Sequence, residues 1–335
     1  EHKADLAEEV ARFFGYNKIP STSIQGAVYG EVTHRQSLER LAVSTLLSQG
    51  VSEIITYTFL SPRALDRVCI PSNSPLRRAV TILNPLGEDS SVMRTCIFPS
   101  MMDVLARNAS NRNASAALFE LGREYIPGAS PDVLPTENPV LALGCYGEQY
   151  DYYVLKGMIE ALLATFGISN WDVERVSNHP TFHPGRCASF TVQGRPLALL
   201  GEAHPTVCKN YELDCRAYLA RIDFNALCEL SDVGRRTYHP LPRFPASTRD
   251  LALLCDDALP VLTIEKAIRS AVGRLLESIE LFDCYRGEQI PQGKKSLAFS
   301  LSLRAGDRTL TDAEVSAKMD IVLATVRTLG AQLRI

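Results

Sequence analysis

The last hundred residues constrain the fold most, because strand-like and helix-like segments alternate there in a fixed order. Residues Ser247 to Leu254 are typical of a strand, and an amphipathic helix follows, with Thr263 as its expected cap and Gly273 as its end. A second strand is expected from Ile279 to Tyr285. The alternation predicts a small domain with its own sheet.

The rest of this segment completes the pattern. The third strand alternates apolar with small residues, namely Leu297, Phe299, Leu301 and Leu303 against Ser296, Ala298, Ser300 and Ser302. One face of this strand therefore belongs to a core and the other face is polar. Thr311 and Glu314 form a capping box that begins a second helix, and a short strand is expected near Leu333. The order βαββαβ defines a ferredoxin-like domain.

Upstream, the chain alternates helices with apolar strands whose short connections favour a mixed, largely antiparallel sheet. Expected helices cover 33–48, 99 onward and 154–166, and expected strands cover 54–59, 79–83, 116–125, 140–146, 189–192, 197–201 and 218–222. Pro240, Pro242 and Pro245 form a stiff linker after Tyr238. The fold class is α+β, with parts at 1–20, 21–238 and 239–335.

Composition excludes several classes of protein. With 335 residues and a formal net charge of −3, the total charge does not indicate a nucleic-acid binder, and any RNA site must be a local patch. No apolar run has the length of a membrane span, and the start at Glu1 has no signal-peptide core, so the chain reads as cytoplasmic and as a fragment. The nine cysteines show no CxxC spacing, which argues for reduced, mostly buried thiols.

Charge is unevenly distributed in the C-terminal domain. Between Arg286 and Arg308, five basic residues stand against two acidic ones, which is a local excess of three. Such a patch on an open sheet could bind single-stranded RNA by base stacking and phosphate contacts. A hairpin whose edge is protected by lysines explains the same residues equally well.

The opening segment is an amphipathic helix that ends at Gly15 and carries an acidic stripe. Asp5, Glu8 and Glu9 could supply oxygen ligands to magnesium. The alternative is a solvated face on which Glu8 pairs with Arg12, and the spacing alone favours it.

Conventional catalytic and nucleotide-binding motifs are missing. The chain contains no Gly-x-Gly pair and no Gly-Lys-Ser/Thr sequence. Pro180, Pro184 and Gly185 break any helix that would align His179, His183 and Cys187 for a metal, so a metal is not favoured there. The strings HPGR (183–186) and GEAHP (201–205) resemble turn-held site residues, although satisfied side chains at strand ends explain them as well.

Several strings together resemble the beta subunit of bacterial phenylalanine–tRNA ligase over essentially the whole chain. They are ADLAEEVARFFGYNKIP (4–20), ILNPLGEDSSVMR (82–94), ALFELGREY (117–125), LKGMIEALL (155–163), HPGR, GEAHP, PRFPASTRDLAL (242–253), FDCYRGEQIPQGKKSLAFSL (282–301) and DRTLTDAEV (307–315). Any one string is weak evidence, but this many in this order is specific.

The resemblance implies a division of labour within a heterotetramer of two alpha and two beta subunits. The alpha subunit binds ATP and attaches phenylalanine to its tRNA, while residues 21–238 are a class II synthetase-like domain without a working active site. A class II site needs an R-x-E motif and a glycine-rich arginine motif to hold ATP; the second is absent, and the only R-x-E is Arg286-Gly287-Glu288 in the C-terminal hairpin.

The resemblance also implies site residues. The family's D-x-x-E-E string matches Asp5, Glu8 and Glu9, so the resemblance favours magnesium binding over a solvated face. The family's first carboxylate would lie upstream of Glu1, so the expected site is incomplete here. The C-terminal part resembles an anticodon-binding domain. The residues expected to contact tRNA for phenylalanine are Tyr285, by stacking on a base, and the basic residues Arg249, Arg286, Lys294, Lys295, Arg304 and Arg308.

Two other functions stay open. One is a self-sufficient ATP-dependent ligase with His183, Arg186, Glu202 and His204 near the chemistry. The other is an RNA-independent protein-interaction scaffold.

Overall fold

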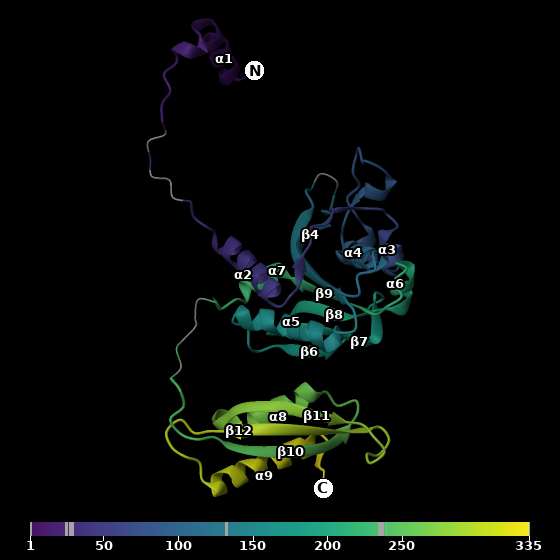
Figure 1. The fold of residues 1–335 in the computed structure, drawn as a ribbon, viewed down its shortest axis with the longest axis vertical. Helices are drawn as coiled ribbons and strands as arrows, with labels where there is room; N and C mark the ends of the chain where they lie inside the picture. The colour runs from purple at the N-terminus through teal and green to yellow at the C-terminus, as the bar shows by residue number, and fades with distance from the viewer. Residues whose placement is uncertain are drawn as a thin grey trace. The chain divides into compact units, whose positions relative to one another are not determined.

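The computed structural model describes residues 2–23, 26, 30–130, 133–233, 238 and 240–334 (Figure 1). It divides into two compact units, Glu1–Arg40 and Leu41–Ile335. The α-helices are α1 Lys3–Phe14, α2 His34–Ser48, α3 Ala64–Arg67, α4 Phe98–Ser110, α5 Tyr152–Thr165, α6 Pro205–Asn210, α7 Phe224–Glu229, α8 Val261–Val272 and α9 Asp312–Thr328. The strands are β1 Ser52–Glu53, β2 Phe59–Leu60, β3 Val92–Met93, β4 Ala116–Ile126, β5 Thr136–Tyr146, β6 Asp172–Arg175, β7 Phe182–Val192, β8 Arg195–Ala203, β9 Ala217–Asp223, β10 Ser247–Asp256, β11 Leu276–Tyr285, β12 Lys294–Leu303 and β13 Gln332–Leu333.

The first unit contains α1, which ends as predicted at Gly15, where a φ of 98° favours glycine. Its apolar stripe is exposed within this unit: Leu6, Val10 and Phe13 are 72%, 67% and 82% exposed.

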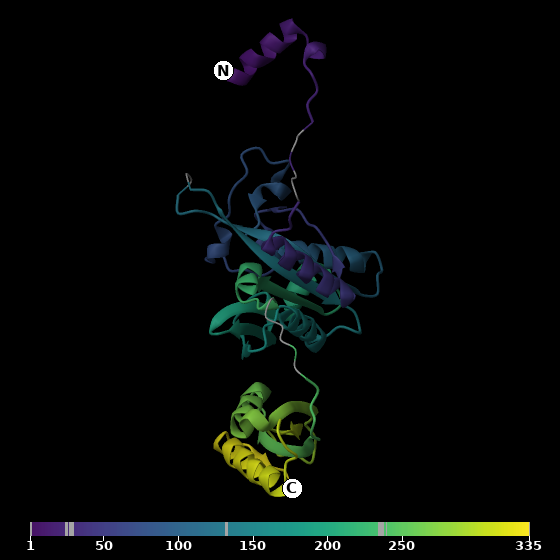
Figure 2. The same ribbon diagram turned by 90° about the vertical axis from the view of Figure 1, so that its left-hand side faces the viewer.

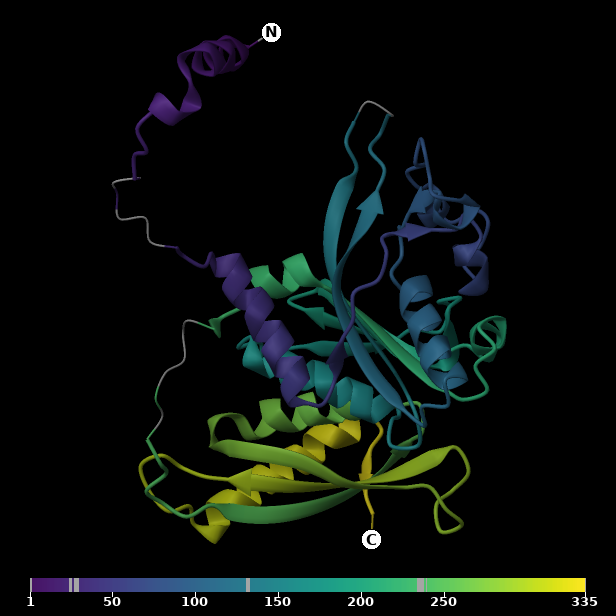
Figure 3. The ribbon, with the colours of Figure 1, turned by 45° about the horizontal axis from the view of Figure 1, so that its top comes forward.

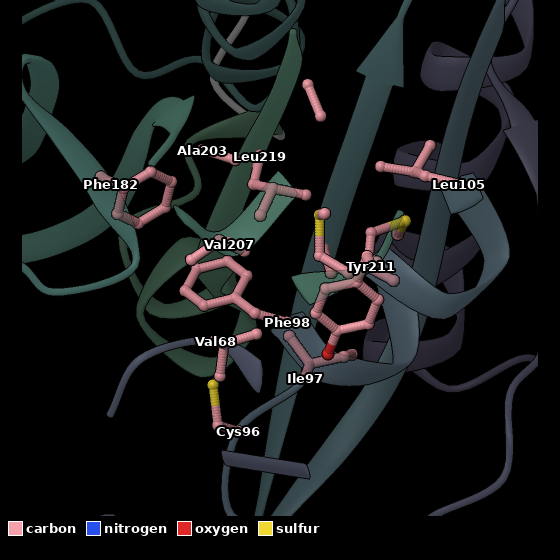
Figure 4. Close-up of a cluster of buried hydrophobic side chains, with 14 of the residues drawn as sticks. Val68, Cys96, Ile97, Phe98, Leu105, Phe182, Ala203, Val207, Tyr211 and Leu219 are labelled. Carbon is pink, nitrogen blue, oxygen red and sulfur yellow. The ribbon is translucent and has the colours of Figure 1, made fainter. Parts of the chain in front are cut away.

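The predicted antiparallel domain is confirmed as a seven-stranded sheet in the order β1-β4-β5-β9-β8-β7-β6. All its neighbours are antiparallel except β1 and β4. Helix α4 packs on one face, where Phe98 joins Phe182, Val207 and Tyr211 in a buried cluster (Figure 4). Figure 3 shows β4 and β5 side by side as two long strands of this sheet.

Two strands predicted here are wrong. Residues 54–58 leave the sheet between β1 and β2, and Thr81 forms only a single bridge to Val92. Side-chain contacts hold the first segment in place of a ladder, because Thr56 Oγ1 donates to Glu120 Oε2 at 2.7 Å. Strand β6 is not apparent in the sequence, since Asp172–Arg175 is short, charged and mostly exposed.

The C-terminal βαββαβ order is confirmed. Its sheet has the order β11-β12-β10-β13, and α8 and α9 lie together on one side of it (Figure 2). One expected boundary is wrong, because α8 begins after Pro260, so Thr263 lies inside the helix and does not cap it. The predicted domain boundary at 238/239 adjoins residues 234–237 and 239, which lie outside the described residues, and the three-part division stays a prediction.

The capping box of α9 makes stability depend on pH. The Thr311 backbone N–H and hydroxyl and the Arg308 guanidinium donate to the Glu314 carboxylate, which lowers the pKa of Glu314 from 4.5 to about 2. A depressed pKa stabilises the fold above the unfolded pKa and loses that contribution as pH falls toward the folded pKa.

We therefore expect the wild type to be more stable than Glu314→Gln above pH 4.5, and the difference to shrink between pH 4.5 and 2. Urea unfolding of both proteins at several pH values measures it. When Thr311 is replaced by valine in both proteins, the stability difference between them should vary less with pH, because the Thr311 hydroxyl no longer donates to Glu314. A difference that stayed constant across this range would contradict the role of the box.

Candidate nucleic-acid interface

Tyr285 lies on the face of the C-terminal sheet opposite α8 and α9. Leu281 pairs with Phe299, a core residue, so the first part of β11 follows the alternation seen in the sequence. A register shift between Leu281 and Asp283 then changes which side chains face the core. As a result Tyr285 pairs with Ser296, and paired residues of antiparallel strands share a face. The β-bulge therefore directs the ring to the open face.

The Tyr285 ring is half-buried and held on two sides. A Cβ atom at Gly287 would lie 2.2 Å from the tyrosine hydroxyl, so the ring packs against this glycine. The guanidinium carbon of Arg334 lies 5.4 Å from the ring centroid, within cation–π range. The stacking role of Tyr285 stays a prediction, but the ring is not part of the core.

Arg334 was missed in the sequence analysis. Its Nη1 donates to Ser296 Oγ at 3.3 Å and its Nη2 donates to Gln289 Oε1 at 3.4 Å. The residue follows β13 and lies 49 positions after Tyr285 in the chain, so no local motif links the two. The one sequence feature that could have drawn attention to Arg334 was its position at the end of a predicted strand.

Most of the predicted tRNA-contacting cations form ion pairs inside the domain. The pairs are Arg249–Asp312 at 3.1 Å, Arg286–Asp257 at 2.7 Å, Lys294–Asp256 at 3.6 Å, Arg304–Glu277 at 2.9 Å and Arg308 with Asp307 at 3.2 Å and with Glu314. Hydrogen bonds from Arg286 and Arg304 lower the pKa of Asp257 and Glu277 respectively. These cations are therefore already partly neutralised.

Lys295 requires a correction. Its side chain is buried, with only 5% of the residue exposed, and Nζ donates to the carbonyl oxygens of Asp257 and Leu259 at 2.9 and 2.7 Å. This ammonium fixes the loop that leads into α8 and is not available to RNA. We withdraw Lys295 from the expected tRNA contacts.

The local excess of positive charge also needs correcting. The count over 286–308 omitted Asp256, Asp257, Glu277, Asp312 and Glu314, which lie outside that window and pair with its cations or with Arg249. Residues 242–334 contain thirteen Lys and Arg against twelve Asp and Glu. The domain is close to neutral, so charge density alone does not identify its RNA-binding surface.

In the middle domain, both histidines of the hypothetical ligase site have structural roles. His183 Nδ1 accepts a hydrogen bond from the Gly185 backbone N–H at 3.1 Å. His204 Nδ1 accepts one from the Thr206 N–H at 3.1 Å and caps α6. These contacts agree with the interpretation that the two strings are satisfied turns.

Arg186 and Glu202 form an ion pair nearby. Arg186 Nη1 donates to both carboxylate oxygens of Glu202 at 2.7 Å, and this contact raises the pKa of Arg186. Arg216 Nε lies 3.9 Å from the same buried carboxylate. The pair stabilises the strand ends, and the described contacts of these residues do not assemble a nucleophile, a base and an orienting group.

Two ion pairs whose carboxylates are buried lie on the α4 side of the sheet. Arg94 Nη2 bonds Glu120 at 2.9 Å, and Arg221 Nη2 bonds Glu124 at 2.6 Å. A Cβ at Gly122 would lie 2.3 Å from Arg94 Nη2, so glycine is needed between the two glutamates. These charges are used within the core, where a catalytic site would need them exposed to a ligand.

In the His179, His183 and Cys187 group, His179 and Cys187 are engaged in the packing of the middle domain. The His179 ring packs against Phe98 and Phe182, and burial lowers its pKa. Burial raises the pKa of the Cys187 thiol to about 12, and does the same for Cys96 and Cys145. Low thiolate character makes these three cysteines unreactive.

The acidic stripe of α1 is partly engaged within the helix. Asp5 Oδ2 accepts from the His2 backbone N–H at 2.8 Å, and Glu9 pairs with Arg12 at 2.5 Å. The expected Glu8–Arg12 pair is therefore replaced by Glu9–Arg12. In the described part of the chain, no three His, Cys, Asp or Glu side chains gather closely enough to hold a metal ion. Asp5, Glu8 and Glu9 do not by themselves fit a magnesium site.

No helix within the described residues combines the length and apolarity needed to cross a membrane.

Together these features define an α+β protein in which a largely antiparallel domain precedes a ferredoxin-like domain with an aromatic ring on its open face. Residues 19–224 match the family described as "Phenylalanyl tRNA synthetase beta chain CLM domain", and residues 242–334 match "Ferredoxin-fold anticodon binding domain". The chain belongs to the phenylalanyl-tRNA synthetase beta chain family, which confirms the resemblance.

Similar curated proteins carry the name phenylalanine–tRNA ligase beta subunit. The chain is 44% identical to that of Clostridium acetobutylicum over 334 residues and 45% identical to that of Clostridium tetani, covering 99% of this chain and 42% of each relative. That of Symbiobacterium thermophilum is 38% identical over 99% of this chain and 38% of its own length. The chain thus spans less than half the length of these relatives.

Proposed function

We propose that this chain is the noncatalytic part of a phenylalanine–tRNA ligase beta subunit. Residues 21–238 scaffold the alpha subunit, which binds ATP and converts ATP, phenylalanine and tRNA to phenylalanyl-tRNA, AMP and diphosphate. Residues 239–335 bind the anticodon region of the tRNA. The assembly is a cytoplasmic heterotetramer of two alpha and two beta subunits.

The observation that carries the proposal is the placement of Tyr285. A ferredoxin-like domain of this family presents an oriented aromatic ring on its open face. Single-stranded RNA is bound by stacking bases on such rings.

A protein partner is supported by exposed apolar side chains in the middle domain. Ile55, Tyr57, Leu83 and Leu86 are 92%, 86%, 101% and 97% exposed. Exposed apolar surface of this kind is typical of protein–protein contacts. The proposed partner is the alpha subunit.

Magnesium belongs to the same proposal. Asp5, Glu8 and Glu9 would each contribute carboxylate oxygens to the ion only together with a further acidic group outside this chain. All three are exposed on α1.

The test is binding of tRNA for phenylalanine, and of the same tRNA with a changed anticodon, to the full-length beta subunit with and without alpha. Tyr285→Ala should weaken binding of the first tRNA by about 1 to 3 kcal/mol and reduce discrimination.

Tyr285→Phe keeps the ring and should behave like the wild type. Equal, feeble binding of both tRNAs by the assembled protein would contradict anticodon recognition. Phenylalanine-dependent exchange of pyrophosphate into ATP by the beta subunit alone would instead support a self-sufficient ligase.

A further inference from the structure

Arg334 occupies a fixed position beside Tyr285. Its backbone N–H donates to the Ala252 carbonyl oxygen at 2.9 Å, which extends the pairing of β13 with β10. The side chain reaches Ser296 Oγ and Gln289 Oε1 and places its guanidinium carbon 5.4 Å from the tyrosine ring centroid. Anchored at both ends, this arginine is pre-organised next to the predicted stacking ring.

The hydrogen-bond partners of Arg334 differ from those of the predicted cations. Both are neutral, and within the described residues Arg334 forms no salt bridge with a carboxylate. Two of its five N–H donors are used in these bonds, which leaves the others for an added acceptor. As far as the described residues go, an anion can bind this guanidinium without first displacing a carboxylate.

The rest of the open face directs a polyanion toward this end of the sheet. Asp250 accepts from Ser300 Oγ, Glu277 accepts from Ser302 Oγ, and Glu280 pairs with Ser300 in the ladder. These carboxylates lie four to six residues along β12 from Ser296, which is about 13 to 20 Å at the rise of a strand. Asp283 also lies on this face, because it pairs with Ala298, and it is nearer, two residues along β12 from Ser296. Phosphates are therefore disfavoured along the acidic part of the face and are favoured only close to the Arg334 guanidinium.

We propose that Arg334 is an RNA-binding residue of this domain, and that its guanidinium binds a backbone phosphate of the nucleotide whose base stacks on Tyr285. This inference rests on the proposed anticodon-region function. The ligand class is a single-stranded phosphodiester with an accessible base. Arg334 thus supplies a phosphate contact that the ion-paired cations could make only by giving up a carboxylate.

The experiment measures the affinity of full-length beta subunit, assembled with alpha, for tRNA across a salt series. Arg334→Gln should bind about tenfold more weakly at low salt, because a charge-assisted hydrogen bond is lost. The slope of log K against log salt should fall by about 0.7, as for one single-strand phosphate. The loss should be similar for the two anticodons, since a phosphate contact carries no sequence information.

Two variants act as controls. Arg334→Lys keeps the charge and should retain the salt slope. Arg327→Gln removes an exposed cation in the last turn of α9, on the helical side of the sheet, and should leave both affinity and slope unchanged.

The outcomes separate this inference from the function on which it rests. A wild-type salt slope and affinity in Arg334→Gln, with Tyr285→Ala still impaired, would overturn the role of Arg334 alone. If the wild type binds tRNAs with either anticodon equally, and Tyr285→Ala binds as tightly as the wild type, the proposed anticodon function is overturned and this inference with it. Equal melting temperatures of the variants and the wild type establish that a binding loss is not a folding loss.

Discussion

Replacing Arg94 by methionine is expected to lower the free energy of unfolding by about 3 to 5 kcal/mol, because it leaves a buried carboxylate without its partner. Arg94 and Glu120 side chains are 1% and 4% exposed. Arg94 also donates to Thr56 Oγ1 at 2.8 Å and to the Arg123 carbonyl oxygen at 2.7 Å. One substitution therefore removes several hydrogen bonds from the core.

Urea unfolding of the wild type and of Arg94→Met measures this effect. The matched control is Arg123→Met on β4, the strand that carries Glu120. The pair of Arg123 with Glu137 has side chains 61% and 48% exposed and should contribute less than about 1 kcal/mol. The double variant Arg94→Met/Glu120→Leu should recover part of the loss, since apolar groups replace both charges. An Arg94→Met protein within 1 kcal/mol of the wild type would refute this account.

Replacing Lys295 by methionine is expected to lower the free energy of unfolding by about 2 to 3 kcal/mol, because two partly buried hydrogen bonds to backbone carbonyl oxygens lose their charged donor. Those oxygens belong to Asp257 and Leu259. The neighbouring Lys294 is the matched control, since its side chain is 37% exposed and lies 3.6 Å from Asp256. Lys294→Met should change the stability by less than about 0.5 kcal/mol.

The same pair of variants tests the correction to the tRNA contacts. At temperatures where Lys295→Met is folded, its salt slope for tRNA binding should equal that of the wild type. A reduced slope without a loss of stability would return Lys295 to the interface and show that its ammonium leaves the two carbonyls when RNA binds.

The C-terminal domain was predictable because each long strand buries one face. The alternation of Leu297, Phe299 and Leu301 with small residues is visible in the sequence and is reproduced in the buried core. The segment from 54 to 58 was not predictable in the same way. Its position depends on Thr56 and a glutamate 64 residues later, and a strand pattern carries no information about such a contact.

The candidate site was only partly predictable from the sequence. Counting charged residues along the chain does not show which of their side chains are buried in the fold. Lys295 lies two and four positions before Leu297 and Phe299 on the same strand, so its side chain points to the same face. The alternation that identified the core face therefore also placed this lysine on it. Tyr285 lies on the open face only because of the bulge, since uninterrupted alternation from Leu281 would have pointed it into the core, and no pattern in the sequence shows that bulge. Arg334 required the sheet order, which brings the end of the chain beside β10.

The bulge in β11 also limits how the length of this strand can vary. A deletion of one residue between Leu281 and Tyr285 would remove the bulge and keep the tyrosine opposite Ser296 on the open face, because the shortened segment then alternates regularly. A deletion of two residues would leave one residue between them, and regular alternation would then turn the tyrosine toward α8 and α9. Variants that lack one residue in this segment should therefore still present the ring, whereas the loss of two residues should be selected against even where the fold survives.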